Sequence, residues 1–241
     1  MPVQSSGQLA LPIFREPRFT EVDFRLASSN AEAWAWLRRT EHWPNHRLAL
    51  WGEAGRGKTH LLHIWARRTG AKICHGPELS GFPGPPTAGV ALDQADGLVD
   101  ETALLHLLNA AAEAGVAVLL AARQPPARWP VHLPDLTSRL RAITAVEIAP
   151  PEDDLLRFLL ARLLADRQLR LPEAVQDWLV RRLPRSAAAV GEAVMRLDAV
   201  ALDRHRNITA RFAAEVLPDI LAPDEISETD ITPSREGEAL L

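Results

Sequence analysis

The chain of 241 residues and 26.5 kDa is long enough for one large domain, or for a domain of about 150 residues and a smaller one. A hydrophobic fraction of 47% and a charged fraction of 24% are typical of a globular protein and exclude a largely disordered chain. The net charge of -4 and the pI near 6.1 give no overall attraction to nucleic acid, so DNA binding would require a local basic patch.

Cysteine usage and hydropathy limit where the protein works. Cys74 is the only cysteine, which excludes an intrachain disulfide and a cysteine-based zinc site and fits a reducing compartment. No apolar stretch approaches the roughly 18 residues needed to span a bilayer, and the N-terminus lacks the basic start of a signal peptide. We therefore expect a cytoplasmic protein with no membrane contact.

The first thirty residues predict a tail and then a helix start. Residues 1–17 contain prolines, serines and a glycine and show no periodic pattern, which predicts an extended tail. Ser28, Ser29 and Asn30 precede the helical pattern of residues 31–39 and predict its N-cap.

Short apolar runs then alternate with helical patterns. The runs at residues 47–51, 71–74, 89–93, 116–122 and 144–148 predict strands. Helical patterns at residues 59–68 and 101–114, and a shorter one from about residue 133, lie between these runs. Strands that alternate with helices indicate a parallel sheet covered by helices on both faces.

The pattern changes after Pro150 and Pro151. Helical patterns at residues 152–168, 172–182, 187–203 and 209–216 follow with no strand-like run, which predicts a small all-α domain. From residue 223 the sequence is acidic and poor in large apolar side chains, so we expect disorder. The predicted organisation is a tail at 1–17, an α/β domain at 18–150, a helical domain at 151–221 and an acidic tail at 222–241.

One motif between a predicted strand and a predicted helix gives the clearest indication of a binding site. Gly52-Glu-Ala-Gly-Arg-Gly57-Lys58-Thr59 matches G-x-x-x-x-G-K-[ST] in full. Its glycines let backbone N–H groups converge on phosphate oxygens, Lys58 neutralises the β and γ charge, and the Thr59 hydroxyl can reach Mg²⁺. The alternative is a glycine-rich turn that only caps a helix, and the full motif favours a nucleotide-binding P-loop.

Acids near the ends of the predicted strands are candidates for the metal side of this site. Asp93 ends a buried run, and a carboxylate there faces the same crevice as the loop, where it would bind Mg²⁺; the alternative is a turn acid. Gln94 follows, where many P-loop ATPases carry a carboxylate that orients the attacking water, so we expect weak or no hydrolysis by the chain alone. Asp96 and Glu101 are nearby, but a loop and a helix N-terminus explain them.

Two further features lie outside the motif. Arg139 is in the short helical pattern before the last strand, where it is either an ordinary surface arginine or an arginine finger for a neighbour's γ-phosphate. Residues 8–13 combine a glutamine with alternating apolar side chains, which either dock in a partner's groove or pack as a strand on their own domain.

Six segments occur in a characteristic order: GQLALPIF, DFRLASSN, GEAGRGKTHLLHIWA, LPDLTSRLRA, LADRQLRLPEAV and LDRHRNITARFAAEVL. In this order and spacing the sequence resembles the Hda/HdaA family, AAA+ relatives of the replication initiator DnaA that lack its DNA-binding domain. The resemblance extends from about residue 8 to residue 217. It implies a P-loop AAA+ parallel-sheet domain followed by a small all-α lid domain.

The resemblance also implies a function. Such a protein binds the DNA-loaded sliding clamp of DNA polymerase III and stimulates hydrolysis of ATP bound to DnaA, which leaves the initiator in its inactive ADP form. It holds ADP or ATP with Mg²⁺ and contacts DNA only indirectly, and a homodimer is compatible with its AAA+ surface. The alternatives are a stand-alone P-loop ATPase and an origin-associated replication factor; no helix-turn-helix pattern follows the predicted lid, which disfavours the second.

Individual positions take roles from this resemblance. Arg139 matches the arginine finger, and Thr59 with Asp93 would bind Mg²⁺. The clamp-binding motif matches Gln8, Leu9, Leu11, Pro12 and Ile13. The expected nucleotide contacts are Gly52, Gly55, Gly57, Lys58, Thr59, His60, Phe24, Asn30 and Arg185.

Three positions depart from the family pattern. Ala188 stands where the sensor II arginine is expected, with Arg185 one turn earlier as its substitute. The sensor I segment at residues 121–125 lacks the acid that relatives carry before a proline pair, and Gln94 replaces the second acid of the metal side. Together they predict nucleotide binding with slow turnover.

Overall fold

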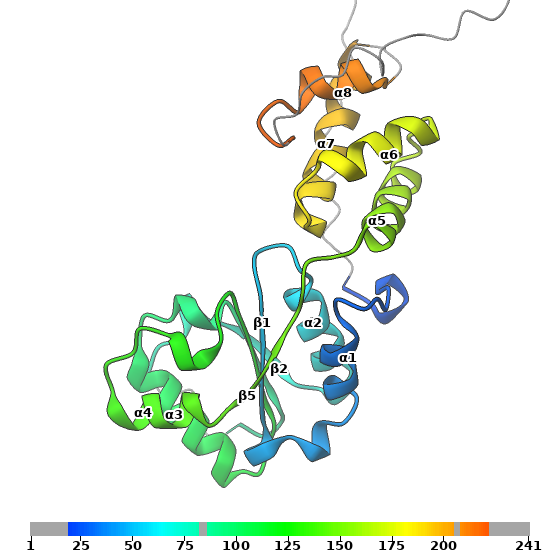
Figure 1. Ribbon diagram of the computed structural model, residues 1–241. Helices are drawn as coiled ribbons and strands as arrows, with labels where there is room; N and C mark the ends of the chain where they lie inside the picture. The colour runs from blue at the N-terminus through cyan, green and yellow to red at the C-terminus, as the bar shows by residue number, and fades with distance from the viewer. Residues whose placement is uncertain (1–18, 82–85, 205–207, 222–241) are drawn as a thin grey trace, which may run out of the picture.

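The computed structural model describes residues 19–81, 86–204 and 208–221, which form a sheet domain followed by a helical domain (Figure 1). The tails predicted at residues 1–17 and 222–241 lie outside these residues. The strands are β1 (Arg47–Trp51), β2 (Lys72–His75), β3 (Val90–Asp93), β4 (Val118–Ala122) and β5 (Thr144–Glu147). They form one parallel sheet in the order β2-β3-β4-β1-β5.

Helices cover both faces of this sheet (Figure 1). Helices α1 (Ala31–Leu37) and α2 (Lys58–Thr69) lie on one face, and α3 (Glu101–Glu113) and α4 (Pro134–Arg141) lie on the other. Side chains alternate along β4, so that Leu119 packs into the core beneath α2 while Leu120 packs into the core beneath α3. Burial on both faces explains why the strands of this sheet read as nearly continuous apolar runs.

The helical domain has its own core. It comprises α5 (Asp153–Asp166), α6 (Glu173–Arg182), α7 (Ala187–Arg204) and α8 (Ala210–Val216). Leu156, Leu160 and Leu164 recur every four residues on α5, which places them on one buried stripe against α6 and α7. The predicted fold class, a P-loop-type parallel sheet domain with a small all-α domain, is confirmed.

Short 3₁₀ turns complete the described elements. They are η1 (Glu21–Asp23), η2 (Thr40–His42), η3 (Pro44–His46), η4 (Gly76–Glu78), η5 (Ala95–Gly97) and η6 (Pro126–Arg128). None of the helices in the described residues combines the length and the apolar character that crossing a membrane requires.

Two local predictions differ from the structure. The run at residues 116–122 becomes a strand only from Val118, because Gly115 adopts a φ of 66° and the Val116 N–H donates back to Ala111 O at 3.0 Å, which closes the end of α3. Asn30 occupies the N-cap position of α1, but its side chain does not cap the helix. Instead it accepts a hydrogen bond from Ala27 N–H and donates one to Arg25 O, and so fixes the preceding loop.

Candidate functional site

The loop between β1 and α2 has the backbone shape that its glycines allow. Gly52 and Gly57 have φ angles of 147° and 94°, and a Cβ at Gly52 would lie 2.7 Å from Ile148 O. Gly57 is the N-cap of α2, so the first N–H groups of that helix, which lack intrahelical partners, lie at the loop. The loop therefore presents the positive end of a helix dipole, which suits an anion.

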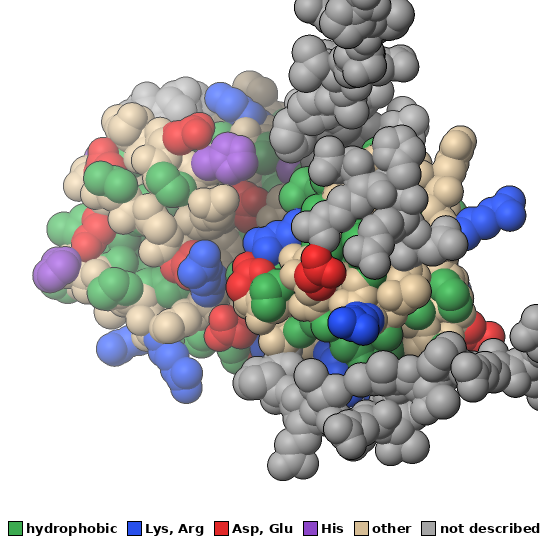
Figure 2. Space-filling model, turned by 90° about the horizontal axis from the view of Figure 1, so that it is seen from above, with side chains coloured by type: hydrophobic (Ala, Val, Ile, Leu, Met, Phe, Trp, Pro, Cys, Tyr) green, Lys and Arg blue, Asp and Glu red, His purple; other side chains and the backbone are tan. Residues whose placement is uncertain are grey.

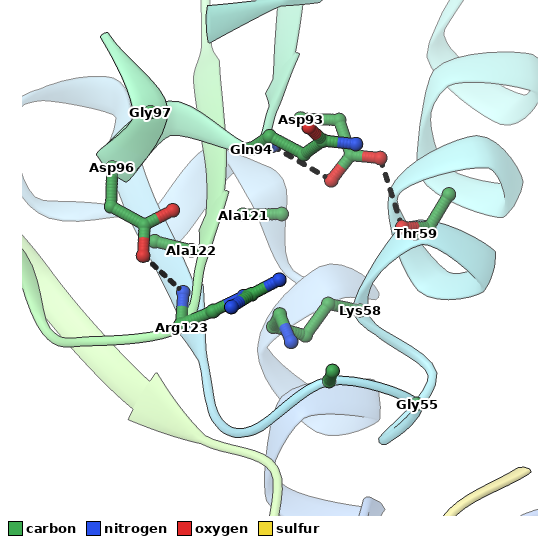
Figure 3. A pocket seen from close by; sticks show the side chains of 11 residues that line it. Gly55, Lys58, Thr59, Asp93, Gln94, Asp96, Gly97, Ala121, Ala122 and Arg123 are labelled. Carbon is green, nitrogen blue, oxygen red and sulfur yellow. Dashed lines mark hydrogen bonds between the residues drawn. The ribbon is translucent and has the colours of Figure 1, made fainter. Parts of the chain in front are cut away.

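A pocket of about 450 Å³ opens above this loop (Figure 3). Its wall consists of the loop with the first residues of α2, the carboxyl end of β3 with the following turn, and the carboxyl end of β4. In parallel α/β sheets ligands bind at this edge, because neighbouring crossover connections leave a crevice there.

Lys58 is positioned by the loop itself. Its ammonium group donates to Gly52 O at 2.6 Å and to Glu53 O at 2.8 Å. An ammonium group has three N–H donors. Since the described residues accept from two of them, the third is left for a phosphate oxygen. Burial lowers the pKa of Lys58, and the negative charges of Asp93 and Asp96 oppose this shift.

Thr59 and Asp93 meet in the pocket as the sequence predicts. The Thr59 hydroxyl donates to Asp93 Oδ2 at 2.9 Å, and Asp93 Oδ1 accepts from Gln94 N–H at 2.9 Å. Hydroxyl and carboxylate oxygens are the hard donors that Mg²⁺ prefers, and Mg²⁺ at nucleotide sites takes few protein ligands besides phosphate and water. The described residues contain no cluster of three or more His, Cys, Asp or Glu that would hold a metal ion by themselves. The donor set therefore fits Mg²⁺ bound together with a phosphate.

The other acids and Gln94 have distinct places. Gln94 lines the pocket at the turn after β3, with a φ of 52°. Asp96 also lines the pocket, and its Oδ2 accepts from Arg123 N–H at 2.8 Å. Glu101 does not line it, because its carboxylate accepts hydrogen bonds from the backbone of His132 and Leu133. Glu101 is a structural acid, as its place at a helix start suggests.

Phe24 and His60, two of the predicted nucleotide contacts, lie together at the start of α2, and neither they nor Asn30 line the phosphate pocket. The Phe24 ring stacks on Trp34 with centroids 5.0 Å apart and meets His60 edge-on at 5.8 Å. His60 Nε2 donates to Thr20 O at 2.9 Å, and burial lowers the pKa of His60. Asn30 is buried in the preceding loop. Their contact with a base stays a prediction.

The helical domain touches the loop through the start of α7. Ala187 N–H donates to Gly55 O at 2.8 Å, and Ser186 Oγ caps α7 by accepting from Ala189 N–H at 3.1 Å. Arg185 is turned toward the junction between the domains, where it pairs with Asp153 at 2.7 Å and donates to Pro151 O at 3.2 Å. Arg185 is thus not among the residues that line the pocket.

Arg139 lies outside the pocket as well. It is in the last turn of α4, on the face of the sheet opposite α2, and its Nε donates to Asp135 Oδ1 at 3.2 Å (Figure 1). One third of its side chain is exposed. It is not among the residues that line the pocket, and its role as an arginine finger for a second molecule stays a prediction. The predicted clamp motif at residues 8–13 lies outside the described residues.

Arg123 is a pocket residue that the sequence prediction placed in the sensor I segment without naming it as a nucleotide contact. It directly follows β4, and its side chain extends into the pocket toward Lys58 (Figure 3). The reasoning that selects Asp93, a polar residue at the carboxyl end of a buried strand, applies equally to Arg123, which directly follows β4. The signal was therefore present in the sequence.

Comparisons with known proteins agree with this architecture. Residues 152–217 match a family model described as "Hda, lid domain". The fold is similar to domain III of the replication initiation protein DnaA from Thermotoga maritima, with a TM-score of 0.70 and 16% identity over 86% of this chain and 99% of that chain. It is also similar to AMPPCP-bound DnaA from Aquifex aeolicus, with a TM-score of 0.62 and 16% identity over 79% of this chain and 68% of that chain. At these identities the structural likeness shows the fold alone, a parallel-sheet domain followed by a helical domain.

Proposed function

We propose that this chain, which is an Hda/DnaA-like AAA+ protein, regulates replication initiation by stimulating hydrolysis of ATP bound to DnaA while attached to the sliding clamp. The observation that carries the proposal is the Hda-type lid at residues 152–217, joined to a DnaA-like AAA+ fold. Both support a DnaA-related regulator of replication initiation. Clamp binding and stimulated hydrolysis are the finer parts of the proposal.

The pocket would hold ADP or ATP. The N-terminus of α2 and the remaining donor of Lys58 offer positive charge to the phosphates. Thr59 and Asp93 would hold Mg²⁺, which neutralises polyphosphate charge when bound. The Lys58 ammonium, fixed by two loop carbonyls, would need no rearrangement to meet a phosphate.

The residues around the phosphates favour holding a nucleotide over hydrolysing it. Gln94 has an amide where a carboxylate would orient or activate a water. Asp93 accepts hydrogen bonds on both oxygens, and one oxygen of Asp96 accepts from a backbone N–H. These contacts support weak intrinsic turnover and hence a regulatory role.

Arg139 supports action on a second molecule. Its ion pair with Asp135 is partly exposed, and exposed pairs of this kind contribute only about 0–1 kcal/mol. A guanidinium held this weakly can leave its carboxylate for a γ-phosphate, with which it makes stronger charge-assisted hydrogen bonds. An arginine offered in this way stabilises the transition state of phosphoryl transfer.

Phosphate release from DnaA-bound ATP, measured with DNA-loaded clamp, tests the proposal. Arg139→Ala is expected to lower the stimulation at least about 100-fold while clamp pull-down and nucleotide affinity persist. Arg141→Ala, an exposed arginine in the same helix, is the matched control and should stimulate normally. Gln8→Ala with Leu11→Ala should abolish clamp pull-down and leave nucleotide affinity intact.

Each part of the proposal has its own contrary result. Normal stimulation by Arg139→Ala would remove the finger role. Normal clamp retention by the double variant would remove the tail role. Wild-type protein that fails to accelerate hydrolysis on DnaA, although loaded on the clamp, would refute the regulatory function itself.

A further inference from the structure

We infer that the end of the sheet domain opposite the nucleotide pocket binds the phosphate backbone of duplex DNA directly, without sequence preference. The surface that would do so is a basic patch formed by Arg38, Arg39, Arg67, Arg68 and Lys72. This goes beyond the family resemblance, which implies only indirect contact with DNA. It also goes beyond the proposed function, on which it rests only for the choice of DNA as the partner.

Three elements bring the side chains of the basic patch together. Helix α1 precedes β1 and helix α2 precedes β2, so both helices end at the amino edge of the parallel sheet. The Arg68 guanidinium donates to Leu37 O, and the Trp65 indole N–H donates to Thr40 Oγ1 at 2.9 Å. These contacts hold the two helix ends side by side, and Lys72 begins β2 at the same edge. The patch therefore lies on ordered elements of the fold.

Acids do not neutralise the basic patch. All five side chains are exposed, and in the part of the chain that the structure describes none of them takes part in an ion pair. Arginines of the helical domain such as Arg157 and Arg162 instead pair with carboxylates. Seen from the other end of the molecule, over the helical domain, basic and acidic side chains are interspersed (Figure 2). The patch is thus distinguished by cations that lack carboxylate partners.

The positive charge of the patch is also larger than the helix ends require. Each helix C-terminus carries about half a negative charge, which a single cation offsets. Glu41 is the acid that interacts with the patch: a hydrogen bond from its own backbone and then one from His42 lower its pKa, and the charge of Arg68 lowers it further. The two helix ends and Glu41 together balance about two of the cations, so about three positive charges remain on a chain whose net charge is -4.

Duplex DNA suits this distribution of charge. It carries one negative charge for about every 1.7 Å of its axis, so a patch that spans two helix ends meets several phosphates at once. Most of the cations are arginines, whose planar guanidinium can make two hydrogen bonds to one phosphate. Contacts to phosphates carry no sequence information, so the binding does not depend on the base sequence.

The start of the described chain points to DNA as the source of these phosphates. The ring of Phe19, the first described residue, lies 4.6 Å from the ring of His63 on α2. Arg67 follows four residues later on the same helix, which is about 6 Å along its axis. The predicted clamp motif ends at Ile13, and the six residues from there to Phe19 can span at most about 20 Å. A clamp bound by that motif would therefore keep the patch close to the DNA on which it is loaded.

Fluorescence anisotropy of a labelled duplex of about 20 base pairs, titrated with the full chain at several salt concentrations, tests this inference. The patch variant combines Arg39→Gln, Arg67→Gln and Lys72→Gln; Arg68 is kept because it donates to Leu37 O. Each neutralised phosphate contributes about 0.9 to the slope of the logarithm of affinity against that of salt concentration. The slope should therefore fall by about 2–3, and the affinity at low salt should fall at least about tenfold.

A second triple variant with the same change in net charge is the matched control. Arg128→Gln, Arg170→Gln and Arg211→Gln remove exposed arginines that lie apart from one another, in η6, before α6 and in α8, and form no ion pair with described residues. This variant should keep the salt slope of the wild-type chain. Both triple variants should keep its unfolding temperature, because all six side chains are exposed.

Several results would overturn the inference. These are an unchanged salt slope in the patch variant, or an equal fall in the control. A wild-type chain that binds vesicles of anionic phospholipid but not the duplex would assign the patch to a lipid surface instead. The variant with Gln8→Ala and Leu11→Ala should keep its affinity for free duplex, and a loss there would assign DNA binding to the tail. Since free duplex is used, failure of clamp binding affects the proposed function and leaves this measurement intact.

Discussion

Replacing Glu152 by glutamine tests how firmly the segment before α1 is attached to the start of the helical domain. Glu152 Oε1 accepts from Ser28 N–H at 2.7 Å and from Ser28 Oγ at 2.8 Å. The Ser29 hydroxyl and then these Ser28 groups favour the carboxylate and lower the pKa of Glu152 from 4.5 to about 2. Glutamine keeps the shape of the side chain but removes the charge.

The shift in pKa sets the magnitude. At about 1.4 kcal/mol for each pH unit, a carboxyl with these folded and unfolded values contributes at most about 3 kcal/mol. The contact lies at the surface, where solvent screens it, so we expect Glu152→Gln to cost about 1–2 kcal/mol at pH 7. Because the folded pKa is the lower one, this contribution is complete above pH 4.5 and is lost as the pH falls toward 2.

Urea unfolding of both proteins at pH 7 and pH 3 measures the difference. Asp154→Asn is the matched control, because Asp154 is also an acid at the start of α5 but is 94% exposed and lies 3.6 Å from Arg157. Its loss should cost less than about 1 kcal/mol. The reasoning is wrong if Glu152→Gln costs no more than this control at pH 7, or if its cost at pH 3 equals its cost at pH 7.

Two further changes address the metal ligands and the lid. Thr59→Val keeps the volume of the side chain but removes the hydroxyl that donates to Asp93. The affinity for MgATP should therefore fall about tenfold, while the affinity for ATP in EDTA changes little. An equal loss of affinity with and without Mg²⁺ would contradict the metal role. Leu179→Ala empties a fully buried position of the lid core and should lower the free energy of unfolding of the lid by about 2–5 kcal/mol in a denaturant titration. Leu202→Ala, at a position that is 61% exposed on α7, should cost under about 1 kcal/mol, and similar costs for the two leucines would contradict the packing argument.

Much of the fold was predictable because its local signals agree with its tertiary structure. Strands β3 and β4 are buried on both faces and therefore appear in the sequence as apolar runs bounded by turns. Gly115 illustrates the limit, since the apolar pattern alone does not reveal that Val116 closes α3 instead of starting β4. The position of β1 between β4 and β5 depends on long-range pairing, for which a single sequence carries little information.

The site was predictable where one rule about parallel sheets applies. Asp93 ends a buried strand, and this position predicted that its carboxylate would face the crevice at the loop, where the structure pairs it with Thr59. The stacking of Phe24 on Trp34 was not predictable, because aromatic contacts between a loop and a helix leave no period in the sequence. Arg185 shows the same difficulty, since its pairing with Asp153 depends on how the two domains join.

Gly55 occupies one of the four positions that the P-loop motif leaves open to any residue, yet the fold allows little choice there. Its φ of 76° is one that side chains of L residues rarely adopt, and a Cβ would lie 2.8 Å from Ser186 Cβ and 2.9 Å from Ala188 Cβ. The backbone of the loop at Gly55 therefore packs directly against the start of α7. A side chain at this variable motif position would force the start of α7 away from the loop even if every phosphate contact survived, so tolerance to mutation here does not follow the consensus pattern.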